Sequence, residues 1–470
     1  MHKLDTRKAL MTLFIIIGIF LAVVVFNVVV HKKKSPETDM KTSIDPKSLA
    51  QYQSVNGVID LHFWETKNGV KVYFVPAHEL PFMDIQVVFD AGSARQNHAK
   101  PIAYFVNILL NEGTGKKNAD DIAEQFEGLG AKYGGDVSRD MASVHLRSLI
   151  DPKRLMPAVE LFAQVVSEPS FPKESLEREK QNALSFLKMQ AQNPGIVAQR
   201  AFFETSYGDH PYGAWDIGNP ETVLSLTLKD LKDFHAQYYT QSNMILTLVG
   251  DVSLGEANWL AEKIAQAFPK GEKALPLPTV PTISKKTLKK ISFPSEQTHL
   301  IYGLPLLRRD DPDYFPLVVG NHILGGNTQS SRVFDIIRGE HGLAYSAYTY
   351  LLPLQAKGPF MMVVQTRKEE ADKTKALMEE ILKTFIEKGP TDVELKDAKQ
   401  NIIGGFPLRF DSNENILSQI SGLGFYQLPL DYFDQYTTNI EKISVEDIKN
   451  AFQKHIDLDK ILWVSLGESS

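Results

Sequence analysis

The chain has 470 residues, of which 43% are hydrophobic and 23% charged, so it is a globular protein long enough for two cores and not a disordered one. It contains no cysteine, which excludes disulfides, thiolate metal sites and cysteine nucleophiles. Six basic residues and a single acidic one lie in the first 34 positions, so the remainder is strongly acidic, which argues against nucleic acid as a partner.

An almost unbroken apolar run covers residues 9–30, and its length matches the roughly 20 residues that a helix needs to cross a bilayer. A basic start makes a cleaved signal peptide the alternative, but no small-residue cleavage site follows the run. We therefore predict an uncleaved membrane anchor (1–34) and a polar tether (35–54). Both flanks are basic, so orientation is weakly set, and we expect the globular part to be periplasmic, at a bacterial inner membrane.

The first globular unit, residues 55–269, opens with strand-like runs at 70–75 and 83–89, the second with clear alternation. Helical patterns follow, and residues 244–249 read as another strand. A proline-rich stretch without periodicity, residues 270–285, is interpreted as a linker. The helical patterns cover residues 102–111, 119–129, 155–166, 173–190, 197–207, 227–239 and 254–268.

The unit 286–470 repeats the first one. The motifs at 179–182, 227–231 and 244–250 recur at offsets of 219, 217 and 217 residues, and near-constant offsets are hard to obtain by chance. We therefore predict two homologous domains of an α+β fold. Two unrelated α+β domains are the alternative interpretation.

The stretch 325–350 combines a helix signal with a strand signal. Apolar residues at 333, 334, 336 and 337 predict an amphipathic helix that carries Arg338 near its end, and Gly342 is typical of a helix C-terminus. Tyr345 then begins an extended run. With residues 297–299, 312–315 and 321–326, this stretch resembles the second-domain signature of the pitrilysin/insulinase family of zinc peptidases, in its bacterial two-chain branch.

The resemblance covers about residue 55 to the C-terminus and implies two α/β-roll domains, with mixed, largely antiparallel sheets flanked by helices. It further implies that Arg338 and Tyr345 reach peptide bound at a zinc site elsewhere. From the residues alone, an exposed arginine favoured by the helix dipole and a tyrosine packed on the core are the alternative. His299 lies on a family-like strand, and both a peptide-contacting and a structural role remain open.

Active members of that family carry a His-x-x-Glu-His helix before a short apolar stretch that ends in Gly-Thr. Histidines four apart share one helix face and one zinc, and the glutamate acts as general base. Aligned on Gly-Thr at 113–114, the ligand positions here hold Tyr104 and Ile108, and the base position holds Asn107. The resemblance places the third ligand at about Ser185 or Phe186. We therefore predict a degenerate site that binds no metal.

The acidic and basic run at 177–180 is interpreted as a solvated helix face with local ion pairs. Altogether we predict a membrane-anchored, non-catalytic subunit of a heterodimeric zinc metallopeptidase, inactive alone and without a cofactor of its own. Its partner would be a catalytic chain with an intact His-x-x-Glu-His motif and zinc, and its substrate a peptide or unfolded protein. The alternative is a non-proteolytic peptide-binding or scaffold protein of the same fold, which could be a homodimer.

Overall fold

The computed structural model of the protein describes residues 44–96 and 100–467. From Ile44 onward the chain forms one compact unit. The predicted anchor (1–34), with its apolar run 9–30, and much of the predicted tether lie outside the described residues. Within the described part, no helix combines the length and the hydropathy that a membrane crossing requires.

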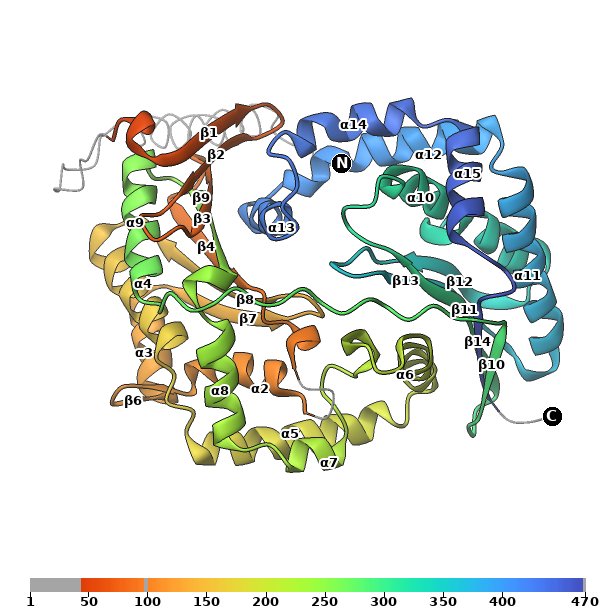
Figure 1. Ribbon diagram of the computed structural model, residues 1–470, viewed down its shortest axis with the longest axis horizontal. Helices are drawn as coiled ribbons and strands as arrows, with labels where there is room; N and C mark the ends of the chain where they lie inside the picture. Colours follow the sequence, from red (N-terminus) through yellow and green to blue (C-terminus); the bar gives the residue numbers. More distant parts are fainter. Residues whose placement is uncertain (1–43, 97–99, 468–470) are drawn as a thin grey trace, which may run out of the picture. The chain divides into compact units, whose positions relative to one another are not determined.

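A mixed sheet of seven strands organises the first half of the chain, in the order β1-β2-β3-β9-β4-β8-β7 (Figure 1). The strand β9 is buried at every position, as expected for a central strand covered on both faces. The pair β3–β9 is parallel and the other pairs are antiparallel. The strands are β1 (Ala50–Asn56), β2 (Asp60–Glu65), β3 (Lys71–Pro76), β4 (Phe82–Phe89), β7 (Lys132–Val137), β8 (Ala142–Leu149) and β9 (Met244–Gly250).

The strand β1 takes in the last residues of the predicted tether, so the fold begins earlier than expected. Its side chains are exposed or half-buried, and a polar edge strand of this kind lacks the apolar alternation by which strands are recognised. A separate two-stranded hairpin is formed by β5 (Gly113–Thr114) and β6 (Lys117–Asn118).

The helices of the first half confirm the predicted helical segments, with α3 and α5 matching residue for residue. Capping boxes begin α8 and α9, where Thr227 and Ser253 exchange hydrogen bonds with Asp230 and Glu256. The helices are α2 (Ile102–Leu109), α3 (Ala119–Leu129), α4 (Pro152–Ser167), α5 (Lys173–Gln190), α6 (Pro194–Tyr207), α7 (Pro220–Leu224), α8 (Leu228–Tyr238) and α9 (Leu254–Gln266).

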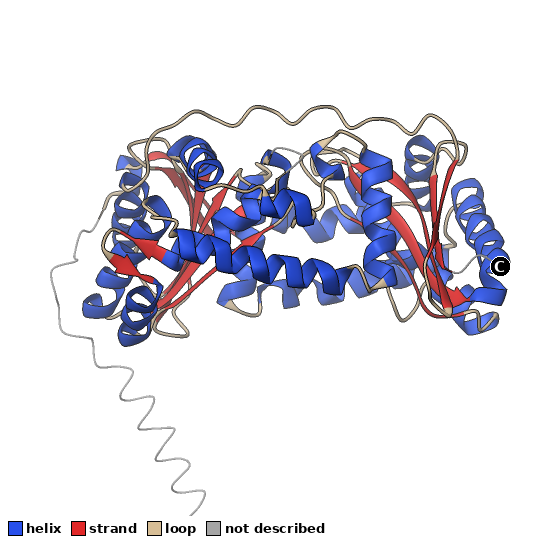
Figure 2. Cartoon of the chain, turned by 90° about the horizontal axis from the view of Figure 1, so that it is seen from below, coloured by secondary structure: helices blue, strands red, loops and turns tan. Residues whose placement is uncertain are grey.

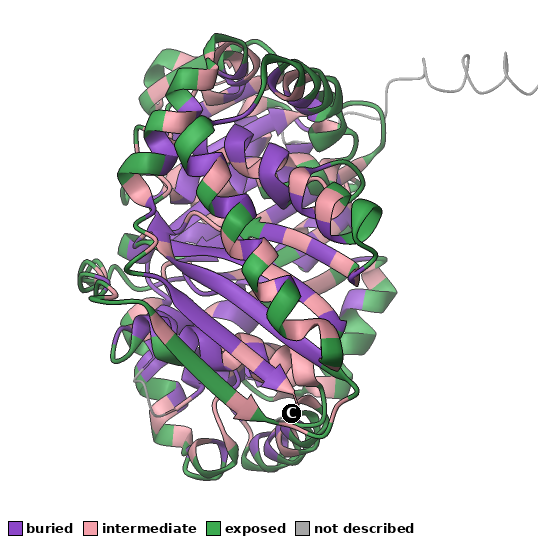
Figure 3. Cartoon of the chain, turned by 90° about the vertical axis from the view of Figure 1, so that its right-hand side faces the viewer, coloured by how far each residue is buried: buried purple, intermediate pink, exposed green. Residues whose placement is uncertain are grey.

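The second half contains a five-stranded sheet in the order β10-β14-β11-β13-β12. Its one parallel pair, β10–β14, corresponds to β3–β9, and the whole order matches β3-β9-β4-β8-β7 of the first sheet, so the internal repeat is confirmed. In Figure 3 the central strands of this half are buried, the edge strand β10 is largely exposed, and the helices have exposed outer faces. The strands are β10 (Thr287–Ser292), β11 (Gln297–Leu307), β12 (Ala344–Leu351), β13 (Gly358–Arg367) and β14 (Leu462–Gly467).

The second sheet is likewise accompanied by helices (Figure 2). Two short π-helical segments, η6 (His322–Gly326) and η7 (Phe334–Glu340), lie between α10 and β12, and η7 replaces the amphipathic α-helix predicted there. The α-helices are α10 (Tyr314–Asn321), α11 (Ala371–Lys388), α12 (Asp392–Gly405), α13 (Asn413–Phe425), α14 (Tyr432–Lys442) and α15 (Val445–His455).

The two halves exchange one helix each. Helix α6 belongs to the first half but packs on β11 and β14, where Phe202 meets Ile301 and Leu462 in one apolar cluster. Helix α13 belongs to the second half but packs on β9, β4 and β3, where Ile420 joins the cluster that contains Val249. Their N-cap residues, at positions 193 and 412, again differ by 219. Each sheet therefore has one face covered by the other half, which explains the single compact unit.

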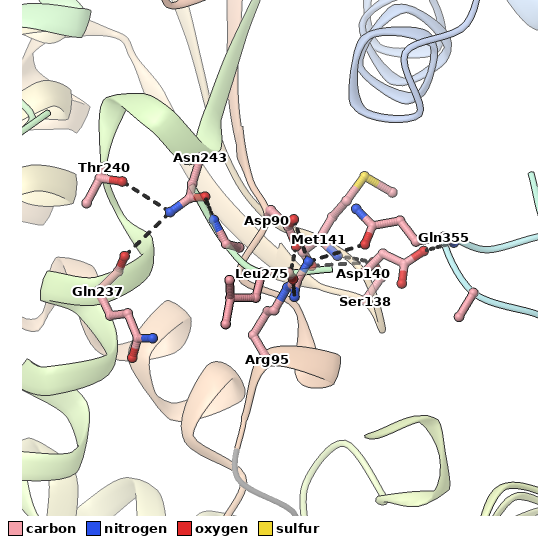
Figure 4. A network of polar contacts seen from close by, with 12 residues as sticks. Asp90, Arg95, Ser138, Asp140, Met141, Gln237, Thr240, Asn243, Leu275 and Gln355 are labelled. Atoms are coloured by element: carbon pink, nitrogen blue, oxygen red, sulfur yellow. Dashed lines mark hydrogen bonds and ion pairs between the residues drawn. The ribbon is translucent and has the colours of Figure 1, made fainter. Parts of the chain in front are cut away.

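The predicted linker runs from α9 to β10 without helix or strand and is held along its length. The side chain of Asn243 donates to the carbonyl of Glu272 at 2.9 Å and accepts from the amide of Ala274 at 2.6 Å. Arg95, paired with Asp90 at 2.6 Å, donates to the carbonyl of Leu275 (Figure 4). Fixed backbone contacts of this kind make the linker a strap and not a loose connection.

A buried carboxylate joins the halves. Asp140, in the turn between β7 and β8, is 1% exposed. It accepts hydrogen bonds from the hydroxyls of Tyr212 at 2.5 Å and Tyr426 at 3.0 Å. It also accepts from the amide of Gln355 at 2.8 Å (Figure 4). Burial raises the pKa of Asp140, although these hydrogen bonds oppose the shift. Two of the three partners, Tyr426 and Gln355, come from the second half, so these hydrogen bonds connect the two halves of the chain.

Candidate functional site

Helix α2, which carries the positions of the zinc motif, is part of the first core. Phe105 is fully buried, while Tyr104 and Ile108 are half-buried and pack against the same cluster. Asn107 is 4% exposed, and its side-chain nitrogen donates to the carbonyl of Ser143 on β8 at 3.1 Å. The position of the general base is thus occupied by an amide that ties α2 to the sheet.

The fit of Asn107 depends on the glycine beside it. A Cβ atom at Gly135 on β7 would lie 2.6 Å from the side-chain oxygen of Asn107, closer than such atoms approach each other. Because Gly135 has no side chain, the amide can lie against the outer strands of the sheet. Asn107 therefore has a clear packing role.

The carboxylates near α2 are already paired with a cation. Arg178 on α5 contacts Glu112, in the turn η3 (Leu110–Glu112), at 2.6 Å and Glu179 at 3.1 Å. Burial raises the pKa of Tyr104, and the negative charge of Glu179 adds to the rise. The guanidinium of Arg178 balances the charge of this acidic group.

The interpretation of residues 177–180 is confirmed in part, because local ion pairs join Arg178 to Glu179 at 3.1 Å and Lys180 to Glu177 at 3.0 Å. The run is not simply a solvated face, since Lys180 is 6% exposed and Arg178 also pairs with Glu112 from another segment. Ser185 and Phe186, where the third ligand was expected, are exposed, and the hydroxyl of Ser185 donates to the carbonyl of Gln181 on its own helix. The role of Arg178 depends on the packing of η3 against α5, for which a single sequence carries no signal.

The residues on α2 do not fit a zinc ion. A phenol, an amide and a sec-butyl group replace two imidazoles and a carboxylate, and an amide cannot serve as general base. Among the described residues, the one group of three ligand-type side chains close enough to share a metal is Asp311, Asp313 and His455 in the second half. There, Asp313 already accepts from His455 at 2.8 Å and from Lys454 at 2.5 Å, so the group links α10 to α15.

Arg338 and Tyr345, by contrast, lie together on the surface. The guanidinium carbon of Arg338 is 5.1 Å from the ring centre of Tyr345 and 4.8 Å from that of Phe334. Tyr345 is 83% exposed, so the alternative of a core-packed tyrosine is wrong. Across the described part of the chain, neither the guanidinium nor the phenolic hydroxyl has a hydrogen-bond or ion-pair partner.

The backbone around the pair explains this exposure. Gly342 adopts a left-handed conformation with φ of 60° and ends η7, as a glycine does at a helix C-terminus. In the ladder between β12 and β13, Ala344 pairs with Thr366 and Ser346 with Gln365, so Tyr345 is the extra residue of a β-bulge. A bulge turns a side chain away from the regular alternation, and here it directs the ring to solvent beside Arg338.

His299 lies on β11 and is 6% exposed. Burial lowers the pKa of its imidazole, which therefore stays neutral at neutral pH. Its ring faces α6, where a Cβ atom at Gly195 would lie 3.6 Å from the side-chain nitrogen Nδ1 of His299. The histidine thus lines the space between α6 and the second sheet.

Two family models match the chain. The model of Insulinase (Peptidase family M16) matches residues 72–217, and the model of the Peptidase M16 inactive domain matches residues 225–402. The crystal structure of a peptidase M16 inactive domain from Pseudomonas fluorescens is 38% identical, covers 87% of this chain and 98% of that chain, and has a TM-score of 0.84. The repeated α/β halves and the altered motif on α2 define a zinc-peptidase fold without a zinc site.

The chain belongs to the insulinase family, peptidase family M16. The non-peptidase homolog YmxG of Helicobacter pylori is 26% identical over 396 residues, which cover 84% of this chain and 91% of that protein. The periplasmic protease PqqL of Escherichia coli shares the fold with a TM-score of 0.75 at 15% identity, and the match covers 49% of its chain. With Tyr104, Asn107 and Ile108 in the motif positions, this family member is inactive as a peptidase on its own.

Proposed function

We propose that this chain is the non-catalytic, membrane-anchored subunit of a two-chain zinc peptidase. The observation that carries the proposal is an exposed Arg338–Tyr345 pair, without internal partners among the described residues, in a chain whose own motif positions cannot bind zinc. The fold of this chain matches about half of the PqqL chain, which is consistent with a complete peptidase built from two such units.

In this proposal, the partner supplies the His-x-x-Glu-His helix with its zinc. The two chains together enclose a substrate chamber, which this chain closes around a peptide or unfolded protein. Arg338 and Tyr345 donate hydrogen bonds to a backbone carbonyl of the bound peptide. Donors fixed in this way align the peptide bond and stabilise the negative charge that develops on the carbonyl oxygen. The cation–π contact keeps the two donors beside each other before the peptide arrives.

The test is a reconstitution with the catalytic family member encoded in the same genome. Arg338→Ala and Tyr345→Phe should lower kcat/KM of the assembled pair by roughly 10²-fold, the scale for removing one charge-stabilising donor. Arg367→Ala, at an arginine whose side chain is 67% exposed near the end of β13, is the matched control and should leave activity unchanged. Wild-type activity in both variants would instead favour the scaffold interpretation.

In this proposal the apolar run 9–30 is the anchor, and the globular part lies in the periplasm if the source is Gram-negative. The absence of cysteine suits an oxidising compartment, because no thiol can form an unwanted disulfide there. Protease added to spheroplasts should digest the chain, and full protection would contradict this orientation.

A further inference from the structure

A pocket of about 420 Å³ lies between α6 and the second sheet, next to the strand that carries Tyr345. Its inner wall includes three buried residues, Ala198 on α6, Ile301 on β11 and Met361 on β13. Tyr348 and Tyr350 of β12 line its other side. The volume falls in the range of about 300–1,000 Å³ that is usual for ligand pockets.

The helix exchange explains why the pocket exists. Helix α6 packs on β14 and β11, whereas β12 lies two strands beyond β11, about 10 Å across the sheet. The sheet face next to β13 and β12 is therefore left partly open. The residues Ser346, Tyr348 and Tyr350 pair with Gln365, Val363 and Met361 and share this open face, because side chains alternate along a strand.

The pocket is uncharged and mostly apolar. None of the residues that line it is Asp, Glu, Lys or Arg, and its polar groups are amides, phenols and the imidazole of His299. Burial lowers the pKa of His299, so the pocket gains no positive charge at neutral pH. A charged side chain would lose its hydration here without meeting a counter-charge, whereas an aromatic or large aliphatic one would bury its surface against Tyr348 and Met361.

The strand β12 supplies a second binding element. It ends the strand order of the second sheet, so within the described residues its outer edge has no strand partner. A peptide that adds to such an edge forms main-chain hydrogen bonds and presents alternate side chains to one face. Tyr348 follows Tyr345 by three residues, about 10 Å along a strand, so the same peptide can reach both the pocket and the Arg338–Tyr345 pair.

We propose that this pocket selects substrates: it binds one large uncharged side chain, aromatic or aliphatic, of an extended peptide that pairs with the outer edge of β12. The inference rests on the proposed function and deepens it, because it names the part of the substrate that the non-catalytic chain recognises. The selected residue lies two to four positions from the peptide bond held by Arg338 and Tyr345.

The test is photo-labelling of the full-length chain in detergent, with no catalytic chain present. The probe is a short peptide of Ser, Thr and Gly with p-benzoylphenylalanine at its centre. Labelling should saturate and map by mass spectrometry to residues of the pocket, such as Met361. A competitor with central Phe should displace the probe at roughly 10-fold lower concentration than one with central Asp, the scale for burying one large apolar side chain.

Gly195→Leu is the variant that should fill the pocket. The atoms nearest to a Cβ atom at Gly195 belong to the side chains of Asn193, at 3.3 Å, and His299, at 3.6 Å. A glycine-to-leucine change also favours the helix, so the variant should fold. Labelling should fall by about 10-fold. The matched control is Gly128→Leu on α3, where nothing lies within 4 Å of an added Cβ, and it should label like the wild type.

Labelling outside the pocket, no saturable labelling, or labelling that Gly195→Leu leaves unchanged would overturn the proposal. Because the assay contains no catalytic chain, its failure is distinguishable from failure of the proposed function, which is read from the activity of Arg338→Ala complexes. A pocket that labels as expected, beside Arg338→Ala complexes with full activity, would support peptide selection without a role in the chemistry.

Discussion

Helix α2 and the segment η7–β12 hold the residues that the family resemblance links to one reaction, and the fold treats them in opposite ways. On α2, Asn107 is buried and bonded to the sheet, and Tyr104 and Ile108 pack on the core. On η7–β12, Arg338 and Tyr345 contact each other and face solvent. The side chains on α2 stabilise the fold, whereas the exposed pair on η7–β12 is accessible to a ligand. Stability measurements can therefore separate the two regions.

The largest expected difference is between Phe105→Ala and Tyr345→Ala. Phe105 is fully buried on α2, so its truncation should lower the free energy of unfolding by about 3–5 kcal/mol. Tyr345 is 83% exposed, and its truncation should change that energy by no more than about 0.5 kcal/mol. Urea unfolding of both variants measures the contrast. Equal losses would mean that Tyr345 supports the fold and would break the comparison.

A smaller effect is expected for Asn107→Glu. The change removes the donor to the Ser143 carbonyl and places a carboxyl in a buried site, so the free energy of unfolding should fall by about 2 kcal/mol. Asn401→Glu, on the exposed surface of α12, is the control and should be nearly neutral.

Adding Tyr104→His and Ile108→His to Asn107→Glu restores the His-x-x-Glu-His sequence on α2, but not a zinc site. Because Arg178 already pairs with Glu112 and Glu179, we expect no tightly held zinc in this triple variant. Metal analysis after gel filtration decides the matter: one zinc per chain would show that α2 still forms a usable site.

The last comparison concerns Asp140, in the turn between β7 and β8, which connects the first half to the second. Burial raises its pKa in the folded protein, so above the ordinary carboxyl value of about 4 the folded state keeps a proton that the unfolded state releases. This contribution to stability is complete at low pH and is lost as the pH rises from about 4, by at most about 1.4 kcal/mol per pH unit. Unfolding measured across pH should show a flatter profile for Asp140→Asn, and identical profiles would contradict the assignment.

Much of the fold follows from local patterns. The predicted helices at 119–129 and 173–190 and the strand β9 are confirmed because capping residues and apolar periodicity act over short distances. The edge strand β1 does not follow from the sequence pattern, because its side chains are exposed or half-buried and it is held by pairing with β2. The exchange of α6 and α13 cannot be predicted from the sequence either, because an apolar helix face does not reveal which sheet it covers.

The candidate site divides in the same way. The amino-acid sequence is enough to show that Tyr104, Asn107 and Ile108 replace the zinc-binding motif. It also shows the spacing of Arg338 and Tyr345. That Tyr345 lies in a β-bulge depends on its pairing with β13, and that Arg178 balances Glu112 and Glu179 depends on tertiary packing. Contacts between segments that are distant in the sequence determine the β-bulge and the ion pairs of Arg178, and such contacts leave no periodic pattern in the sequence.

The exchange of helices also has a consequence for synthesis of the chain. When β9 leaves the ribosome, the first sheet has all its strands, but the face that contains Val249 lacks its cover until α13 has been made. At ordinary elongation rates that interval lasts roughly 10–35 seconds. Nascent chains stalled within 270–285 should therefore be digested readily by protease, and those extended beyond α13 should resist. Each half thus completes its folding only when the helix supplied by the other half is present.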